Sequence, residues 1–465
     1  MPDVSLTAAE IAAVTRGRLV SGNGEQRIER WSIDSRSVAP GEMFVAIRGD
    51  RFDGHEFAAA AVGHGAAGVV VESGRAGEFH GGLVIAVDDT TRALQDVARE
   101  VRRRSGAKVV AITGSAGKTT TKELTANFLS ARFSVFRNKG NLNNHIGLPL
   151  SLLELRSRPD VAVVELGMNH AGEIRTLVGI AEPDVRVWTN VGDAHLGFFA
   201  SADAIADAKA EIAENARPAD RLIVNADDPR IMARSKRFAG RTVTFGLSEE
   251  ADVRASAVQA RGLDGMAADV STPAGRVRVS TPLLGTGNLL NLLAAAAVAT
   301  EYGVSLDEIA LRAAALRPAP HRGELTRLPG GVTLIDDSYN SSPAALLRAL
   351  EVVRSATGSA RKVGVLGEML ELGAHSAGLH EQCGRAAAAA GLDLLIAVGG
   401  DAAIRLADAA RAAGMADAAV SYARTSDEAA DIALKKIRPG DLVLVKGSHG
   451  IRTDVVVDRL KVEFA

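Results

Sequence analysis

Residues 108–129 read KVVAITGSAGKTTTKELTANFL, and this segment restricts the fold more than any other part of the chain. An apolar run, typical of a strand buried on both faces, leads into a short loop with two glycines and then into a sequence that favours an amphipathic helix. A strand followed directly by a helix is typical of parallel sheets with crossover helices. The segment therefore indicates an α/β fold.

The same alternation continues towards the end of the chain, where short apolar runs are separated by alanine-rich stretches that favour helices. We expect strands at residues 108–112, 161–166, 186–190, 221–225, 332–336, 362–366, 393–398 and 441–446. Most of these runs lack polar residues at alternate positions, as burial on both faces of a parallel sheet requires.

A chain of 465 residues is long enough for about three domains. Residues 1–106 contain short strands and many glycines, which predicts a small mixed domain ending near an arginine-rich junction. Residues 107–317 carry the segment described above, and we expect a central parallel-sheet domain with hairpins at 251–282. Two prolines in RPAPHR (317–322) interrupt a helix, so residues 318–465 are expected to form a third, Rossmann-like α/β domain.

Composition excludes several classes of function. Lys and Arg number 54 against 56 Asp and Glu, and this net charge of −2 offers no field that would attract nucleic acid or anionic lipid. A single cysteine, Cys383, permits neither an intramolecular disulfide nor a multi-cysteine metal site. The first residues resemble no export signal, and the most apolar window, 289–299, is too short to span a bilayer. We expect a cytoplasmic protein without membrane insertion.

The loop between the strand and the helix has the residues that bind a polyphosphate. Gly114 and Gly117 allow backbone amides to approach phosphates, and the helix presents its positive end to them. Lys118 can reach the outer phosphates, and the Thr119 hydroxyl can bind magnesium. An ordinary glycine-rich turn is the alternative, but the flanking strand and helix favour a phosphate loop of the shortened GxxGKT form.

Polar residues follow two other predicted strands, with Glu165 at the end of one and Asp193 and His195 after the next. Ligands gather at the carboxyl ends of parallel strands, so Glu165 and His195 are candidates to hold divalent ions near the loop. The alternative is that each side chain fixes its own loop by hydrogen bonds. Lys209 lies among acidic residues on a predicted helix, and its spacing alone indicates a solvated face.

Three further polar clusters follow apolar runs, at residues 140–145, 336–340 and 446–449. Turn and helix-cap chemistry is one explanation for such Asn-rich and Asp-Ser segments. Together with TGSAGKTTT, VGDAHLG, NADDP and NLLN, however, the cluster IDDSYN resembles the motifs of the Mur ligase family, over essentially the whole chain. The segments GNLNNHIGLPLSLL and VELGMNHAGEI resemble the branch that adds D-alanyl-D-alanine, and residues 32–71 are similar to its UDP-muramoyl-binding module.

The resemblance implies an ATP-dependent amide ligase. It would join D-alanyl-D-alanine to UDP-N-acetylmuramoyl-tripeptide through an acyl phosphate, release ADP and phosphate, and act as a monomer. Two alternatives stay open: the related ligase that adds a diamino acid, and a nucleotide-binding regulatory module without ligase turnover. Acceptor dependence of phosphate release separates them.

The resemblance also assigns residues. For ATP it implies Gly114, Ser115, Ala116, Gly117, Lys118, Thr119, Thr120, Asn291 at the adenine, Arg322 at the γ-phosphate and Asp337 at the ribose. For two magnesium ions it implies Thr119, Glu165, His195 and Lys209, the last as a carbamate. Catalysis would depend on Lys118, Lys209, His195 and Arg322. The UDP-sugar peptide would contact Ser35, Arg36, Asp53, Gly54, His55, Asn141 and Asn144.

The chain departs from the family pattern at three places. Gly287 stands where relatives often carry histidine, KGSHG with His449 stands where they often read KGSR, and NSSP at 340–343 replaces NANP.

Overall fold

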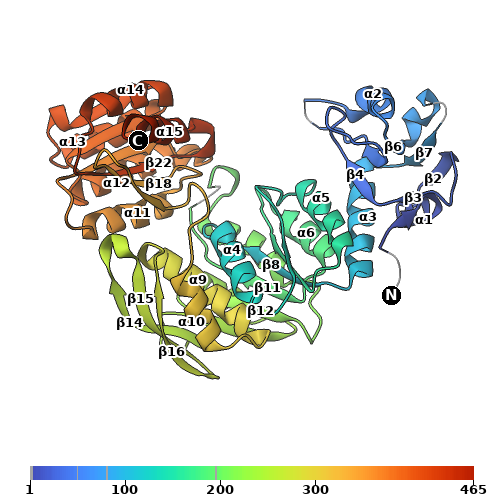
Figure 1. Ribbon diagram of the computed structural model, residues 1–465, viewed down its shortest axis with the longest axis horizontal. Helices are drawn as coiled ribbons and strands as arrows, with labels where there is room; N and C mark the ends of the chain where they lie inside the picture. Colours follow the sequence, from blue (N-terminus) through green and yellow to red (C-terminus); the bar gives the residue numbers. More distant parts are fainter. Residues whose placement is uncertain (1–3, 50, 80–81, 194–195) are drawn as a thin grey trace.

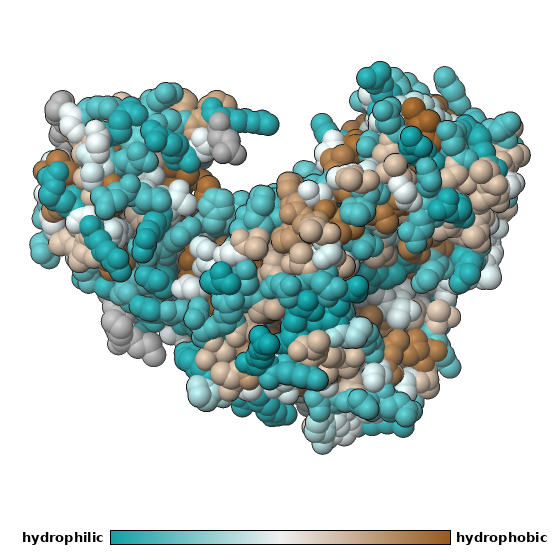
Figure 2. Space-filling model, turned by 180° about the vertical axis from the view of Figure 1, so that it is seen from behind, coloured by the Kyte–Doolittle hydropathy of each residue, from teal (hydrophilic) through white to brown (hydrophobic). Residues whose placement is uncertain are grey.

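A computed structural model describes residues 4–49, 51–79, 82–193 and 196–465. Three sheet-containing parts follow one another along the chain and form an open V (Figure 1). The central part forms the base, and the N-terminal and C-terminal parts form the two arms. Figure 2 shows from behind that the notch between the arms is open to solvent.

The central sheet has the strand order β16-β15-β14-β13-β12-β11-β8-β10-β9. Its strands from β9 to β14 pair in parallel, and β14, β15 and β16 form the antiparallel hairpins expected at 251–282. The strands are β8 (Lys108–Thr113), β9 (Val135–Arg137), β10 (Val161–Glu165), β11 (Val185–Trp188), β12 (Arg221–Asn225), β13 (Arg241–Gly246), β14 (Val253–Ala260), β15 (Met266–Thr272) and β16 (Gly275–Thr281).

Helices cover both faces of this sheet because its strands are apolar on both sides. Val110 and Ile112 of β8 pack in one core with α4 and α9, whereas Val109 and Ala111 face a second core on the other side. The helices of the central part are α4 (Lys118–Leu129), α5 (Gly147–Leu153), α6 (Glu173–Ala181), α7 (Ala202–Ala210), α8 (Pro229–Ser235), α9 (Gly285–Glu301) and α10 (Leu306–Ala314).

The C-terminal sheet has the order β17-β18-β22-β19-β20-β21, parallel except for the edge strand β17. Its strands are β17 (Glu324–Arg327), β18 (Thr333–Asp337), β19 (Arg361–Gly367), β20 (Leu394–Val398), β21 (Val420–Ala423) and β22 (Asp441–Lys446). Its helices are α11 (Pro343–Ser355), α12 (Ser376–Ala389), α13 (Asp401–Ala412), α14 (Ser426–Lys436) and α15 (Asp454–Glu463).

The N-terminal part is smaller and mixed, as expected. Its main sheet has the order β2-β7-β6-β5-β4, and β1 pairs with β3. Its elements are β1 (Leu6–Thr7), α1 (Ala8–Val14), β2 (Arg18–Ser21), β3 (Arg27–Ile28), β4 (Arg30–Ser32), β5 (Glu42–Val45), α2 (Ala58–Gly63), β6 (Gly68–Glu72), β7 (Leu83–Val87) and α3 (Thr90–Ser105). The arginine-rich segment forms the last two turns of α3, which ends at Ser105 and is capped by Gly106 with φ 72°.

Strand register brings the functional segments together. Glu165 at the end of β10 pairs with Ile112 of β8, and Thr113 at the end of β8 pairs with Trp188 of β11. The loops after β8, β10 and β11 therefore leave the sheet at one edge. The three-part α/β fold is confirmed, whereas the boundaries at 106/107 and 317/318 stay predictions. In the described part of the chain, each helix is too short or too polar to traverse a lipid bilayer.

Candidate functional site

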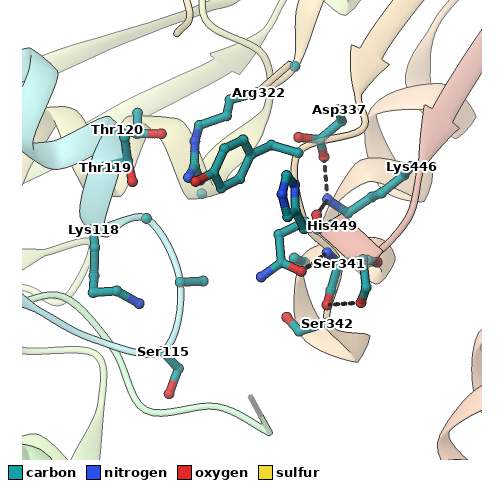
Figure 3. Close-up of a pocket in the computed structure, with 18 of the residues that line it drawn as sticks. Ser115, Lys118, Thr119, Thr120, Arg322, Asp337, Ser341, Ser342, Lys446 and His449 are labelled. Carbon is teal, nitrogen blue, oxygen red and sulfur yellow. Dashed lines mark hydrogen bonds and ion pairs between the residues drawn. The ribbon is translucent and has the colours of Figure 1, made fainter. Parts of the chain in front are cut away.

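A cleft of about 520 Å³ lies between the central and C-terminal parts. Lys118, Thr119 and Thr120 at the start of α4 lie on one wall, and Asp337, Lys446 and His449 lie on the other (Figure 3). The cleft is polar at the phosphate loop, and its walls come from two domains. A ligand that fills it must therefore contact both domains.

The phosphate loop has the conformation that its glycines allow. Gly117 adopts φ 81°, in the left-handed region that glycine enters without strain, and α4 begins at the next residue. The Lys118 ammonium donates a hydrogen bond to the Gly114 carbonyl at 2.9 Å and folds over the loop. Ser115, Ala116 and Thr120 also line the cleft. The Ser115 and Ala116 amides donate to Asn190, at 3.0 and 2.9 Å. The first amides of α4, which have no partner within the helix, and the Lys118 ammonium are therefore the groups suited to bind phosphate.

Glu165 lies beside the loop and is buried. Its Oε2 accepts a hydrogen bond from the Thr119 hydroxyl at 2.7 Å, and its Oε1 accepts one from the Asn143 amide at 2.8 Å. Burial alone would raise the pKa of Glu165, but the Lys118 charge and these two donors bring that pKa below its ordinary value. Burial lowers the pKa of Lys118, and the Glu165 carboxylate opposes this effect. Glu165 is therefore an ionised carboxylate next to a hydroxyl.

This pair fits a hard divalent cation. A carboxylate and a hydroxyl 2.7 Å apart supply oxygen ligands, and magnesium commonly takes one or two protein oxygens together with phosphate oxygens and water. Within the ranges that the structure describes, no three His, Cys, Asp or Glu side chains form a metal-binding cluster. His195, the third expected ligand, lies outside the described residues, as does its neighbour at 194.

Lys209 is buried, so the interpretation of its spacing as a solvated face is wrong. Its side chain is on the inner face of α7 and is 1% exposed. Asp203 and Asp207 of the same helix are exposed and pair with Arg234. These acidic residues therefore lie on the solvent face of α7, whereas Lys209 lies on the opposite, buried face. Burial lowers the pKa of Lys209 well below its ordinary value, and the charge of Lys118 lowers it further.

Asn291 lies against the phosphate loop. Its Oδ1 accepts a hydrogen bond from the Thr121 hydroxyl at 3.3 Å, and a Cβ atom at Gly117 would lie only 2.2 Å from that oxygen. Its amide nitrogen donates to Asn288 at 3.3 Å. Helix α9 thus delivers an amide side chain to the cleft next to the start of α4.

The opposite wall is organised by a buried lysine. The Lys446 ammonium, at the end of β22, donates to Asp337 at 2.6 Å and to the Asn340 carbonyl at 2.9 Å. Asp337 ends β18, which pairs with β22, so the ion pair follows from the strand register. The Asp337 carboxylate is thereby held in one orientation at the cleft.

Arg322 enters the cleft from the segment that joins the two domains. Its guanidinium lies 4.1 Å from the centre of the Tyr339 ring, and the His449 ring lies 5.6 Å from that same centre. The Tyr339 ring thus contacts both Arg322 and His449. Figure 3 shows Arg322 on the side of the cleft nearer to Thr119 and Thr120. Tyr339 and His449 therefore have a structural role in the wall of the cleft.

Some cleft residues were not singled out individually from the sequence. Asn143 donates a hydrogen bond to Glu165, and Arg348 lines the far end of the cleft. Glu371 lines the cleft from the C-terminal part, and its charge partly opposes the lowering of the Lys118 pKa by burial. The Gly197 amide donates to the Glu371 carbonyl at 2.8 Å and thus joins the two domains. Of these residues, only Asn143 lay in a segment that the sequence analysis had marked, the polar cluster at 140–145.

The two substrate residues expected in the central domain differ in their position relative to the cleft. Asn141 lines the cleft. Asn144 does not line it; its Oδ1 accepts hydrogen bonds from the Ile146 and Gly147 amides, at 3.2 and 2.8 Å, where α5 begins. The cap chemistry that was the alternative for this cluster therefore describes the contacts of Asn144.

The expected UDP-sugar residues lie in the N-terminal part and do not line this cleft. Asp53 accepts hydrogen bonds from the His55 amide at 3.0 Å and from its ring nitrogen at 2.6 Å, and the other ring nitrogen accepts from the Glu72 amide. Arg36 is exposed and pairs with Asp34 at 2.7 Å. Ser35 accepts a bond from His64 through its carbonyl, and Gly54 packs against the backbone of Ile47.

Comparison with known protein families gives three successive matches. A model described as "Mur ligase family, catalytic domain" matches residues 27–102, "Mur ligase middle domain" matches 112–299, and "Mur ligase, glutamate ligase domain" matches 321–449.

Curated relatives match over nearly the full length. The UDP-N-acetylmuramoyl-tripeptide–D-alanyl-D-alanine ligase of Bacillus subtilis is 31% identical over 458 residues, which is 98% of each chain. The ligase of the same name from Escherichia coli is 36% identical over 399 residues, covering 85% of this chain and 86% of that one.

Solved structures agree. MurF from Acinetobacter baumannii superposes with a TM-score of 0.88 at 32% identity, covering 99% of this chain and 100% of that one. The MurF ligase from Thermotoga maritima in complex with ADP has a TM-score of 0.83 at 30% identity, covering 94% and 98%.

Proposed function

Since this chain belongs to the Mur ligase family, we propose that it joins D-alanyl-D-alanine to UDP-N-acetylmuramoyl-tripeptide with ATP, a step of peptidoglycan precursor synthesis. The observation that carries this proposal is the two-domain cleft, in which a phosphate loop faces the Asp337–Lys446 pair. Full-length relatives with that activity support the identity of the substrates.

The reaction needs activation because a carboxylate is a poor electrophile. ATP transfers its γ-phosphoryl group to the terminal carboxylate of the tripeptide, which gives an acyl phosphate and ADP. The amine of the dipeptide then attacks the acyl carbon, phosphate leaves, and the amine proton passes to solvent. The protein's contribution is placement and electrostatic stabilisation of charge on the phosphoryl group.

Each group in the cleft has a proposed part in this reaction. The amides at the start of α4 and the Lys118 ammonium hold the β- and γ-phosphates, and Arg322 approaches the γ-phosphate from the domain junction. Asn291 binds the base, and Asp337, oriented by Lys446, binds the ribose. Because these contacts come from two domains, nucleotide binding draws the C-terminal domain towards the central one.

Magnesium fits the Thr119–Glu165 pair, with His195 and Lys209 as further proposed ligands. When bound, the metal neutralises phosphate charge and orients the transferred group. We also propose that Lys209 carries a carbamate, since burial of its side chain favours the neutral amine, the form that reacts with carbon dioxide. Carbon-13 NMR after equilibration with labelled bicarbonate tests this, with Lys209→Ala as the control.

The N-terminal domain is proposed to bind the UDP-sugar end of the substrate through Ser35, Arg36, Asp53, Gly54 and His55, with Asn141 and Asn144 at the peptide. Domain limits at 106/107 and 317/318 and a monomeric chain are parts of the same proposal, which limited proteolysis and sedimentation check. An intracellular, cytoplasmic location is likewise proposed, because ATP and nucleotide-linked sugars are supplied there.

The test is phosphate release by the purified protein with ATP, magnesium, UDP-N-acetylmuramoyl-tripeptide and D-alanyl-D-alanine, omitting one component at a time. We expect release to require all of them, and Lys118→Ala to lower the rate at least about a hundredfold. Release with lysine or meso-diaminopimelate as acceptor would favour the related ligase. Release that ignores both peptides would favour a nucleotide-binding module.

A further inference from the structure

Beyond the phosphate loop, the cleft is lined by the start of α9 and the middle of α11. Its lining there is mainly apolar and includes Leu284, Ile335, Ala349 and Val352. One cationic side chain shares this end of the cleft, that of Arg348 on α11. A guanidinium among apolar side chains loses hydration, and burial accordingly lowers the pKa of Arg348 while Glu351 opposes this effect.

Gly287 on α9 makes room for this arginine. A Cβ atom at position 287 would lie 3.1 Å from Cδ and 3.2 Å from Nη1 of Arg348, closer than most side chains tolerate. The Arg348 Nε also donates to the carbonyl of Ala344, one turn back along α11, at 3.1 Å. The guanidinium is therefore fixed against the bare backbone of α9 and is not a freely moving surface charge.

The position of Arg348 along the cleft distinguishes a base from a phosphate as its ligand. Asn291 touches the phosphate loop at Gly117. Gly287 precedes Asn291 by four residues, which places it about 6 Å further along the axis of α9. In a nucleotide the ribose separates the phosphates from the base, so a triphosphate held at Lys118 leaves its base, not its phosphates, near this end of the cleft.

We propose that the Arg348 guanidinium forms one wall of the nucleobase pocket and stacks on the base of ATP. This inference rests on the proposed use of ATP and adds a positioning residue from the C-terminal domain. A planar guanidinium packs well on the face of an aromatic ring, and the apolar neighbours suit a base better than a phosphate. The base is thus held only when the two domains are in contact at Gly287.

Calorimetric titration of two ligands tests this role. ATP carries the base, whereas inorganic tripolyphosphate carries only the phosphates. In Arg348→Ala we expect the Kd of ATP to rise about tenfold and that of tripolyphosphate to stay within about twofold. Arg348→Lys, which keeps the charge but lacks the plane, should resemble the alanine variant. Arg354→Ala, which removes an exposed arginine from the same helix, should leave both values unchanged.

Two results would overturn the inference: an unchanged Kd for ATP in Arg348→Ala, or an equal loss for ATP and tripolyphosphate, which would assign the arginine to the phosphates or to the fold. Unaltered tripolyphosphate binding also shows that the variant is folded. Failure of the wild type to ligate the dipeptide, with ATP bound normally, would refute the proposed function and leave this inference intact.

Discussion

Replacing Gly117 by alanine tests the phosphate loop most sharply, because the structure offers a matched control. Gly117 and Gly106 both adopt left-handed backbone angles, φ 81° and 72°. An alanine at either position costs about 1–2 kcal/mol of backbone strain. A Cβ at Gly106 meets nothing within 4 Å, whereas one at Gly117 lies 2.2 Å from the Asn291 side-chain oxygen.

The magnitude follows from this difference. Gly106→Ala should lower the free energy of unfolding by about 1–2 kcal/mol. Gly117→Ala should cost about 1–2 kcal/mol more, since it displaces Asn291 and leaves buried polar atoms without their hydrogen bond to Thr121. Because Asn291 is the proposed ligand of the base, the affinity for ADP should also fall at least about tenfold, and in Gly106→Ala it should not change.

Urea unfolding followed by tryptophan fluorescence measures the free energy of unfolding, and calorimetry measures the Kd of ADP. The chain has two tryptophans, so a Trp31→Phe background leaves Trp188, which is buried in β11 of the central sheet, as the reporter. The reasoning is refuted if Gly117→Ala binds ADP as tightly as the wild type, or if it loses no more stability than Gly106→Ala.

Three further outcomes are expected. Glu165→Gln should raise the magnesium concentration for half-maximal rate at least about tenfold, and an unchanged magnesium dependence would contradict a metal site there. The His55 amide and ring, with Arg48, lower the pKa of Asp53 from 3.8 to about 2, so its stabilising effect is complete above about pH 5 and is lost as the pH falls through 2. Asp53→Asn should therefore lower the free energy of unfolding by about 1 kcal/mol at pH 7, after allowance for solvent screening, and by much less at pH 2; a loss independent of pH would argue against this. Burial raises the pKa of Cys383 to about 12, so the folded protein should not react with a thiol reagent at pH 8, whereas the urea-unfolded chain should take up one equivalent; rapid reaction of the folded protein would show that this packing is wrong.

Local patterns predicted the α/β fold because its strands are buried on both faces. The apolar run at residues 442–445, with Asp441 before it and Lys446 after it, predicted a buried strand at 441–446, and the observed β22 has those same bounds. The phosphate loop was equally accessible, since strand, glycines, lysine and helix are adjacent in sequence. These features depend on interactions within one segment.

Features that depend on tertiary neighbours were harder to predict. The spacing of Lys209 suggested a solvated face because it reports only the neighbours on its own helix, whereas the burial of its side chain is set by packing against other elements. The resemblance identified Gly287 only as a missing imidazole, but the structure places Arg348, 61 positions later, against it. Such pairs have no signal in a single sequence, because nothing local couples the two residues.

The central claim is that ATP activates a carboxylate for attack by an amine, and oxygen-18 labelling tests it most directly. The terminal carboxylate of the tripeptide is labelled, and the phosphate released in the presence of ATP, magnesium and D-alanyl-D-alanine is analysed by mass spectrometry. An acyl phosphate requires one labelled oxygen to appear in the phosphate for each amide formed. Amide formation with unlabelled phosphate would contradict the account.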